Sequence, residues 1–280
     1  MPDYIDLHVH SDYSDGRMSP RQIVDRGLTL GLKAIAITDH DCLSGYEEAA
    51  AYAEGKSIEI VAATEFSAEV GKSDIHILAY LFRPDNAGFR KALDGFRNLR
   101  YERGNKMVER LQALGVKVNF EDVMEVAGKA AVGRPHLAEA MVKNGQVSSY
   151  DQAFKRYLFQ GGPVYMSKAK LAPAEAIELI HAADGLAVMA HPGLTKRDDI
   201  IDGLAADGLD GLEIFHPTHN SSSRKRYGQM ALRHSLCLTG GSDAHHRPGR
   251  YGDIGDEKVP YEYLIEMKNR LCSKSQRLNG

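Results

Sequence analysis

The sequence predicts an α/β fold in which a mostly parallel sheet presents polar side chains at the carboxyl ends of its strands. Short apolar runs alternate with helical patterns over residues 1–85 and again over residues 185–280. The block between them, residues 86–184, is almost entirely helical in its periodicity. No glycine-rich phosphate loop follows the first strand, so a barrel related to the (β/α)₈ type is favoured over a doubly wound sheet.

The first 85 residues contain four predicted strands and two predicted helices. A strand at 4–9 precedes a helix at 19–31, for which Ser19 is a good N-cap, Pro20 suits the first turn and Gly31 ends the helix. The other elements follow from apolar runs bounded by turn residues. They are a strand at 33–38, a helix at 44–55, and strands at 58–69 and 74–82 joined by a turn at 71–74.

The remainder of the chain divides into a helical insertion and a second α/β part. Residues 86–184 follow the fourth strand and precede the fifth, so they are predicted to be inserted into a barrel formed by residues 1–85 and 185–280. We predict strands at 185–191, 211–216 and 236–245, and helices at 196–207, 221–235 and 260–272. The predicted barrel therefore has seven strands.

Composition and charge exclude several classes of protein. The formal net charge is −3, which gives no global attraction to duplex DNA, RNA or anionic lipid. The three cysteines are widely separated, so neither a disulfide framework nor a thiolate zinc site is expected. The sequence shows no targeting segment and no apolar run of membrane-spanning length. We expect a cytoplasmic protein with no evident obligate protein partner.

Polar residues at the ends of the predicted strands include most of the twelve histidines. A single histidine at such a place is more often a hydrogen-bonded structural residue than a metal ligand. The same chemistry at six strand ends, which meet at one face of a barrel, indicates a shared metal site. The residues are His8 and His10, His40, Glu65, His191, Glu213 and His216 with His219 beyond, and Asp243 with His245 and His246.

The ligand types indicate the metal and the chemistry. Imidazoles and carboxylates without a thiolate suit Zn²⁺, Mn²⁺ or Fe²⁺. About nine candidate ligands exceed what one ion needs, so two or three ions that share carboxylates are expected. Clustered ions suit the hydrolysis of phosphate esters, because they lower the pKa of a bound water and neutralise the phosphoryl oxygens.

Four motifs in this chain resemble those of the polymerase and histidinol phosphatase (PHP) superfamily. They are D-x-H-x-H at 6–10, T-D-H-D at 38–41, A-H-P-G at 190–193 and S-D-A-H at 242–245. The resemblance implies a distorted (β/α)₇ PHP barrel and a centre of three divalent ions (Mn²⁺, Fe²⁺ or Zn²⁺). The ligands it implies are His8, His10, Glu65 and Asp243 for one ion, Asp15, His40 and His245 for the second, and Glu65, His76 and His191 for the third.

Asp15 and the insertion narrow the resemblance to one branch. Many superfamily members have a histidine where this chain has Asp15. An aspartate there resembles the 3′,5′-nucleoside bisphosphate phosphatases and related 5′-to-3′ exonucleases that act on short RNA. Such an enzyme hydrolyses the 3′-phosphate of a nucleoside 3′,5′-bisphosphate to leave the 5′-monophosphate, and trims short 5′-phosphorylated RNA. The substrate of this chain is therefore expected to be a nucleotide or short RNA.

Substrate choice is expected to reside in the insertion. Arg100 and Arg103 lie three residues apart on one predicted helix face, and Arg134 precedes another helix. The resemblance implies that these arginines bind a second phosphate, for which the planar guanidinium is suited. The alternative is that Arg100 and Arg103 lie on a solvated helix face. His136 contacts substrate or caps its helix, and stacking on a base remains open for the aromatic side chains Tyr101, Phe154, Tyr157 and Tyr165.

The expected mechanism is in-line attack of a metal-bridging hydroxide on phosphorus. Asp243 would orient this nucleophile, and His216, His219 or a metal-bound water would protonate the leaving oxygen. Alternatives within the superfamily are the hydrolysis of histidinol phosphate or phosphotyrosine, and exonucleolytic proofreading. A different class is a non-catalytic PHP module stabilised by metal. A non-enzymatic nucleic-acid-binding protein is disfavoured by the net charge.

Overall fold

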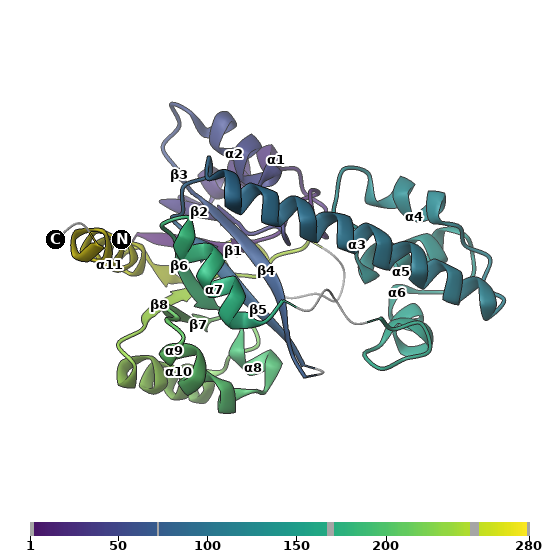
Figure 1. Ribbon diagram of the computed structural model, residues 1–280. Coiled ribbons are helices and arrows are strands. Elements are labelled where there is room, and N and C mark those ends of the chain that lie inside the picture. The colour runs from purple at the N-terminus through teal and green to yellow at the C-terminus, as the bar shows by residue number, and fades with distance from the viewer. Residues whose placement is uncertain (1–2, 72, 167–170, 247–251, 279–280) are drawn as a thin grey trace.

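The computed structural model describes residues 3–71, 73–166, 171–246 and 252–278, and its strands form two sheets. The order of the first sheet is β3 (Glu59–Val61), β2 (Ala34–Ile37), β1 (Tyr4–Val9) and β9 (Val259–Pro260). The order of the second is β4 (Ala63–Val70), β5 (Ser73–Tyr80), β6 (Leu186–Met189), β7 (Gly211–Phe215) and β8 (Cys237–Gly240). Figure 1 shows both sheets at the centre of the molecule.

The predicted α/β class is confirmed, but the pairing differs from a single parallel sheet. The predicted strand at 58–69 divides at Ala62, and its two halves enter different sheets as β3 and β4. β5 runs antiparallel to both β4 and β6. Within the described residues the strands do not close into a barrel, although isolated bridges between Val9 and Ala244 and between His40 and Glu65 connect the two sheets.

The hairpin of β4 and β5 explains the antiparallel pairing. A parallel connection needs a crossover of a dozen or more residues, whereas only a short turn at Gly71 separates these two strands. Gly71 has a φ of 66°, which a glycine adopts without strain. The last predicted strand, 236–245, ends at Gly240, so the segment with Asp243 and His245 is a loop.

Helices cover both sheets and extend beyond them. α1 (Pro20–Thr29) starts at the predicted cap, where the Ser19 side chain accepts a hydrogen bond from the Gln22 backbone N–H. The predicted helix at 196–207 is divided into a 3₁₀ turn and a short α-helix. The other helices up to β6 are α2 (Ser44–Ala53), α3 (Ala87–Ala113), α4 (Phe120–Ala127), α5 (Arg134–Lys143), α6 (Tyr150–Ala153), the π-helix η1 (Phe154–Leu158) and α7 (Pro173–Ala182). After β6 come α8 (Pro192–Thr195), η2 (Asp198–Ile200), α9 (Ile201–Ala206), α10 (Ser221–Arg233) and α11 (Glu262–Leu278).

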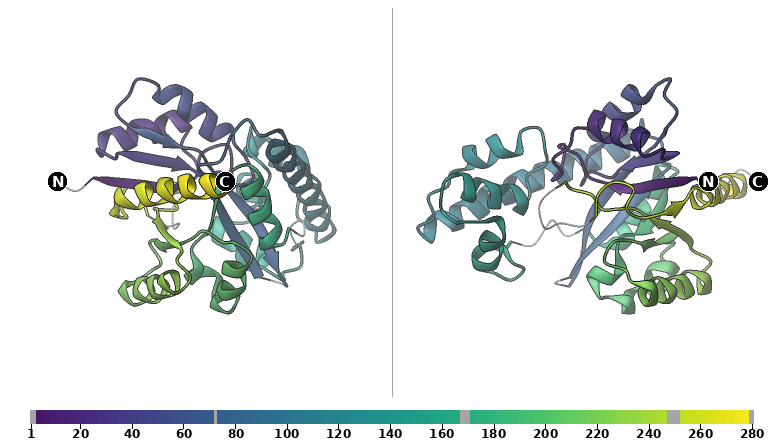
Figure 2. Two further views of the ribbon diagram at one scale, coloured as in Figure 1. Left: turned by 60° about the vertical axis from the view of Figure 1, so that its left-hand side comes forward. Right: turned by 180° about the vertical axis from the view of Figure 1, so that it is seen from behind.

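Two hydrophobic clusters divide the segment between β5 and β6. The distal end of α3 packs with α4, α5, α6 and η1 around Met107, Leu137 and Leu158, all almost fully buried. In contrast, α7 and the start of α3 pack against the second sheet. Figures 1 and 2 show α4, α5 and α6 standing beyond one end of the sheets, with α3 connecting the two parts.

The fold places the predicted polar residues at one end of the sheets. His8 and His10 lie at the end of β1, His191 follows β6, and Asp243 lies in the loop after β8. This end of the sheets faces the helices α4 to α6 (Figure 1). None of the helices in the described part of the chain has the length and apolar character needed to span a bilayer.

Candidate metal centre and adjoining cavity

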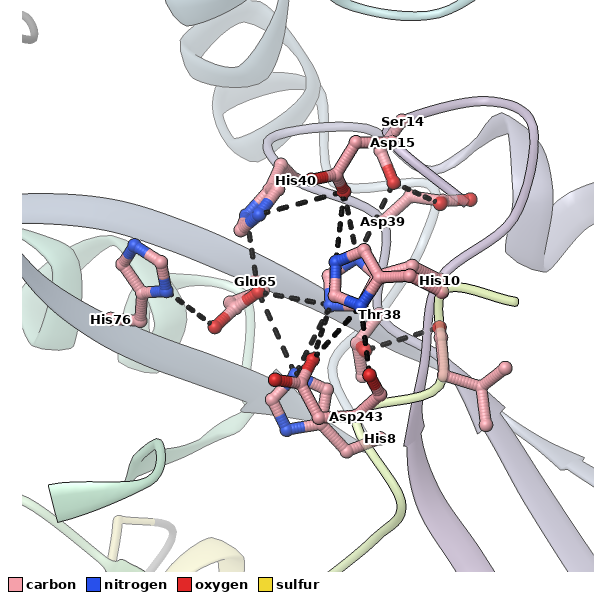
Figure 3. A network of polar contacts seen from close by, with 12 residues as sticks. His8, His10, Ser14, Asp15, Thr38, Asp39, His40, Glu65, His76 and Asp243 are labelled. Carbon is pink, nitrogen blue, oxygen red and sulfur yellow. Dashed lines mark hydrogen bonds and ion pairs between the residues drawn. The ribbon is translucent and has the colours of Figure 1, made fainter. Parts of the chain in front are cut away.

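The nine predicted metal ligands lie in one cluster, which Figure 3 shows in part. Their nitrogen and oxygen atoms form overlapping groups within 4.8 Å, and most of the side chains are buried. The groups are His8, His10 and Asp243; His10, Asp15, His40 and His245; His8, Glu65 and His191; and His40, Glu65 and His76. Side chains far apart in sequence are thus brought together by the strand ends.

Two carboxylates lie close to the Nε2 atoms of His8 and His10. The Nε2 atoms of His8 and His10 lie 3.2 Å apart, and each is 3.3 to 3.6 Å from Glu65 Oε2 and Asp243 Oδ1. Four ligands at about 2.1 Å from a tetrahedral ion stand about 3.4 Å apart. The spacing therefore fits a divalent ion held by His8, His10 and Asp243, and Glu65 Oε2 lies beside both imidazole nitrogens without joining the same close group.

Asp15 lies at the centre of the second predicted set. Its Oδ1 is 3.1 Å from His245 Nε2 and 3.8 Å from His40 Nε2. The Nδ1 of His10 is 3.7 Å from the same oxygen, so His10 borders both sets. The imidazole and carboxylate atoms of this set suit the same divalent ions.

Glu65 connects the third predicted set to the others. Its Oε1 lies 2.8 Å from His76 Nδ1 and 3.2 Å from His191 Nε2, while its Oε2 lies 3.1 Å from His40 Nδ1. The closest groups pair His76 with His40 and His191 with His8, so the third set is less separate than predicted. A carboxylate with imidazoles on both oxygens can bridge two ions.

The charged groups of the cluster shift one another's pKa values. Burial lowers the pKa of His10, but hydrogen bonds to Asp243 and Glu65 raise it to about 10. Burial likewise lowers the pKa of His8, but Glu213, Asp243 and Glu65 raise it well above its ordinary value. Although burial raises the pKa values of Glu65 and Asp243, the surrounding histidines hold them well below the ordinary range. The cluster thus attracts positive charge.

Hydrogen bonds fix which nitrogen of two histidines faces the cluster. His8 Nδ1 donates to Glu213 Oε1 at 2.8 Å, and His245 Nδ1 donates to the Asp243 carbonyl oxygen at 2.8 Å. A proton on Nδ1 leaves the Nε2 lone pair directed at the cluster, as a metal ligand requires. The residues present therefore fit a centre of divalent ions.

Ser14 and Asp39 orient His10 in the same way. The Ser14 hydroxyl donates to Asp39 Oδ1 at 2.5 Å, so it accepts from His10 Nδ1, 3.3 Å away (Figure 3). Asp39 also accepts from the Ser11 backbone N–H at 2.8 Å. With its Nδ1 proton held by Ser14, His10 also directs Nε2 at the cluster.

The roles of Asp39 and Glu213 were not predicted. Asp39 stands inside the T-D-H-D motif, and Glu213 was noted only as a polar residue at a strand end. Both are completely buried, and a buried carboxylate needs hydrogen-bond donors around it. An acidic residue in an otherwise apolar strand was therefore the available signal. Asp6, the first residue of the D-x-H-x-H motif, accepts from the backbone N–H groups of His8 and Ser242.

The two predicted proton donors occupy different positions. His216 Nδ1 accepts from the Thr218 backbone N–H at 3.2 Å, so Nε2 carries the proton and donates to Asp243 Oδ2 at 3.3 Å. His219 Nδ1 donates to the Ile214 carbonyl oxygen and its Nε2 accepts from the Gly193 N–H, both at 3.1 Å. Both nitrogens of His219 are therefore used within the fold, and its role as proton donor stays a prediction.

A cavity of about 330 Å³ opens beside the ligand cluster. One side is formed by Asp15, His40, His76 and His191 from the cluster. The other side is formed by Arg100, Arg103, Arg134 and His136, with Phe154 and Leu194 as apolar residues. The cavity therefore brings the predicted metal ligands and the predicted phosphate-binding arginines to one space.

The three arginines differ in their partners. Arg100 Nε donates to Asp41 Oδ2 at 2.7 Å, and Arg134 Nη2 lies 3.3 Å from Asp74 Oδ2. Within the described residues Arg103 makes no hydrogen bond and no ion pair. Burial, together with the positive charges of Arg100 and Arg134, lowers its pKa to about 10. Asp74 offsets part of this charge, and Arg103 is the arginine of the three with no direct partner among the described residues.

Comparisons with known proteins agree with this site. The family model described as PHP domain matches residues 6–162. A 3′,5′-nucleoside bisphosphate phosphatase of Chromobacterium violaceum is 33% identical over 258 residues, covering 90% of each chain. A 5′-3′ exoribonuclease of Haemophilus influenzae is 32% identical over 266 residues, covering 91% of this chain and 96% of its own.

A solved structure agrees over nearly the whole molecule. A protein of Bifidobacterium adolescentis, described as a metal-dependent phosphoesterase, superposes with a TM-score of 0.87 at 31% identity. The match covers 96% of this chain and 98% of that protein. Together with the motifs and the cluster of ligands, these similarities show a metal-dependent phosphoesterase fold. The chain belongs to the PHP domain family.

Proposed function

We propose that this chain is a metal-dependent phosphatase that removes the 3′-phosphate of nucleoside 3′,5′-bisphosphates and also trims short 5′-phosphorylated RNA. The observation that carries the proposal is Arg103, a partly buried cation without an ion-pair partner among the described residues, in the same cavity as the metal ligands. A substrate with two phosphates satisfies both ends of this cavity. Relatives named as a bisphosphate phosphatase and an exoribonuclease support the same substrate class.

The ligand cluster would hold the reacting phosphate. We propose three ions, of Mn²⁺, Fe²⁺ or Zn²⁺, in the sets centred on His8 with His10, on Asp15, and on Glu65. When bound, such ions lower the pKa of water and neutralise charge on phosphoryl oxygens. Asp243 lies at the inner edge of the cluster, where its Oδ2 accepts from His216. In the proposed reaction Asp243 orients the attacking water, and the His216 hydrogen bond fixes that carboxylate.

The arginines would hold the second phosphate. The Arg103 guanidinium supplies the uncompensated charge, and Arg134 lies at the first turn of α5, where the helix dipole also favours an anion. Asp41 and Asp74 already neutralise much of the charge of Arg100 and Arg134, so these two contribute direction more than net charge.

The segment 86–184 would select the substrate. Its helices supply all three arginines and Phe154, which lines the same cavity and suits the apolar face of a nucleoside. We therefore propose that this segment is the recognition subdomain, with its own hydrophobic core, and that residues 1–85 and 185–280 carry the hydrolytic site.

Kinetics with matched substrates test the proposal. Phosphate release is measured with Mn²⁺ from adenosine 3′,5′-bisphosphate and from adenosine 3′-monophosphate, which lacks the second phosphate. The Arg103→Met variant should raise KM for the bisphosphate about 10- to 100-fold, the value of one or two charge-assisted hydrogen bonds. It should change KM for the monophosphate less than threefold. Lys106→Met, an exposed cation on the same helix, is the control and should change neither.

A substrate panel tests the alternatives. It contains the bisphosphate, a short 5′-phosphorylated RNA, histidinol phosphate and phosphotyrosine. Greater kcat/KM for histidinol phosphate or phosphotyrosine than for both nucleotide substrates would refute the proposed specificity. The absence of hydrolysis of any of them by metal-loaded protein would favour a non-catalytic PHP module.

A further inference from the structure

Glu213 on β7 contacts two predicted metal ligands from two other parts of the fold. Its side chain is fully buried. Oε1 accepts from His8 Nδ1 at 2.8 Å, and Oε2 accepts from the backbone N–H of His191 at 2.7 Å. His8 lies at the end of β1 and His191 directly after β6, so one carboxylate ties together ligands on different sheets.

We propose that Glu213 is a positioning residue that couples two metal positions, by holding the ring of His8 and the backbone of His191 at the same time. This inference rests on the proposed metal-dependent function. Glu213 does not need to touch an ion or the substrate. It acts by deciding where two ligands point, and outer hydrogen bonds of this kind typically change metal affinity 10- to 100-fold.

The contact with His8 fixes the direction of its lone pair. When the Nδ1–H of His8 donates its hydrogen bond to Glu213, the Nε2 atom of His8 faces His10 Nε2 at 3.2 Å and Asp243 Oδ1 at 3.4 Å. Rotation of the ring would remove Nε2 from this position and leave a buried carboxylate without its donor. The first metal position therefore depends on Glu213 through His8.

The contact with His191 fixes a backbone conformation. His191 has a backbone φ of 26°, which residues other than glycine rarely adopt. The hydrogen bond from its N–H to Glu213 holds this conformation, which brings the ring Nε2 to 3.2 Å from Glu65 Oε1. The position between Glu65 and His191 therefore also depends on Glu213.

A carboxylate is required because both partners are N–H donors. The substitution Glu213→Gln keeps the size of the side chain but replaces one acceptor oxygen by an NH₂ group. That group faces either the His8 Nδ1–H or the His191 backbone N–H, and two donors repel each other. Either orientation of the amide releases one of the two ligands, and Glu213→Asp keeps both acceptors on a shorter side chain.

Asp210 offers a matched control in the same fold. It too is buried, and its Oδ2 accepts from a histidine ring, His181 Nε2 at 2.8 Å, and from a backbone N–H, that of Ala187 at 3.0 Å. Both donors meet the same oxygen here, and Oδ1 forms ion pairs with Arg270 and Lys274, at the opposite ends of β6 and β7 from the ligand cluster. Asp210→Asn therefore perturbs a buried carboxylate that also joins a histidine ring to a backbone N–H, without touching a predicted ligand, and controls for general destabilisation.

The experiment measures metal binding directly. Wild type, Glu213→Gln, Glu213→Asp and Asp210→Asn are stripped with chelator, dialysed against fixed free Mn²⁺ or Zn²⁺, and analysed for bound metal and melting temperature. Co²⁺ absorption reports the ligand geometry. We expect Glu213→Gln to weaken binding at two positions together, 10- to 100-fold, with a changed Co²⁺ spectrum. The metal affinity of Glu213→Asp should lie between those of wild type and Glu213→Gln. Asp210→Asn should bind metal like wild type even if its melting temperature falls.

Two results would overturn the coupling. One is a folded Glu213→Gln protein with wild-type metal content and Co²⁺ spectrum. The other is an equal loss of metal in Glu213→Gln and Asp210→Asn, because that would reflect general destabilisation. If Glu213→Gln does not fold, Glu213→Asp is decisive on the same readouts. Hydrolysis of the bisphosphate is assayed separately. If the variants show the coupling but metal-loaded wild type does not hydrolyse the bisphosphate, only the proposed function is refuted.

Discussion

At the scale of single residues, the site is organised around Glu65. This carboxylate in β4 is 1% exposed, and its two oxygens lie within 3.6 Å of nitrogens from five histidines. Those nitrogens belong to His8, His10, His40, His76 and His191. Ring nitrogens that direct lone pairs at a buried carboxylate, as Nε2 of His8 and His10 do, repel it unless cations lie between them, which is why the cluster fits divalent ions.

Arg103 leads to a stability prediction at this scale. Its pKa is lowered to about 10 from 12.5, because burial and two neighbouring cations disfavour its charged form. Below pH 10 the folded chain therefore bears an energetic cost for this charge, which disappears when the charge is removed. We expect Arg103→Met to stabilise the substrate-free protein by about 1 to 3 kcal/mol at pH 7, following the size of the shift.

Urea unfolding at pH 7 measures this change. The stabilisation should shrink when a second phosphate is bound, because the ligand then balances the charge of wild-type Arg103. Lys106→Met, on the exposed side of α3, serves as the control and should leave the free energy of unfolding within 0.5 kcal/mol of wild type. Destabilisation by Arg103→Met would show that the arginine is held by contacts that its surroundings do not reveal.

At the scale of elements, α2 approaches the ligand loop closely. The Asp39 carboxylate accepts from Ser11 and Ser14, and it lies directly against Gly45 in the first turn of α2. A Cβ on Gly45 would overlap Asp39 Oδ2 and stand 2.8 Å from the Ser11 hydroxyl. Glycine is therefore required here by close approach and not by backbone conformation.

Two glycine substitutions compare this contact with an open position. Gly45→Ala pushes on a fully buried carboxylate that fixes Ser14 and, through it, His10, so we expect a loss of about 2 to 4 kcal/mol in stability, as for overpacked or disrupted buried sites. Gly95→Ala lies on the exposed face of α3 with no atom within 4 Å of the added Cβ, and should stabilise by about 0.5 to 1 kcal/mol. Thermal unfolding with bound and removed metal measures both.

The metal readout separates the two effects of Gly45→Ala. Displacement of Asp39 should also weaken Mn²⁺ binding, because His10 loses the partner that directs its Nε2. An alanine at position 45 with unchanged stability and unchanged Mn²⁺ affinity would mean that α2 shifts away without disturbing the loop.

At the scale of the whole molecule, metal and protons compete for one cluster. In metal-free protein His10, with its pKa raised to about 10, is a doubly protonated imidazolium cation at pH 7. His8, whose pKa is also raised, takes the same form. Ions bind the deprotonated rings, so their binding must release protons and must weaken as pH falls. We expect proton release on Zn²⁺ addition at pH 7, measurable by titration in weakly buffered solution.

The same shifts predict how stability depends on pH. A histidine with a raised pKa contributes stability that is complete below its unfolded value of about 6.5 and is lost as pH rises through about 10. Metal-free protein should therefore lose melting temperature between pH 8 and pH 10, whereas metal-loaded protein should not. Parallel melting curves for the two forms over this range would contradict the competition.

The metal ligands could be predicted from the sequence because strand periodicity is a local property of the chain. Two histidines two residues apart on a strand share a face, and residues after successive strands meet at one end of a sheet. His8, His10, His40 and His191 could be placed together on these grounds, and the family resemblance added Asp15 and His76. Sequence patterns also gave the α/β class and the capped start of α1 at Ser19.

Other features depended on long-range packing. The division of the strand at Ala62 and the antiparallel place of β5 follow from which sheet each segment can cover, not from its own residues. The partner of Arg100 is also far away in the sequence, because Asp41 lies 59 residues from it. No helix pattern distinguishes the paired Arg100 from Arg103.

The sequence by itself determined that this protein is an α/β protein with a cluster of histidine and carboxylate ligands. Residue type, strand period and strand ends are local properties of the sequence and need no long-range contacts. Only the tertiary structure decided which nitrogen of each histidine faces the cluster, that Arg103 is the arginine with its charge uncompensated, and that Glu213 joins two ligands. The contacts of Glu213 join segments more than 20 residues apart, and even the local contacts of His10 and His245 direct their nitrogens at the cluster only once the sheets have packed.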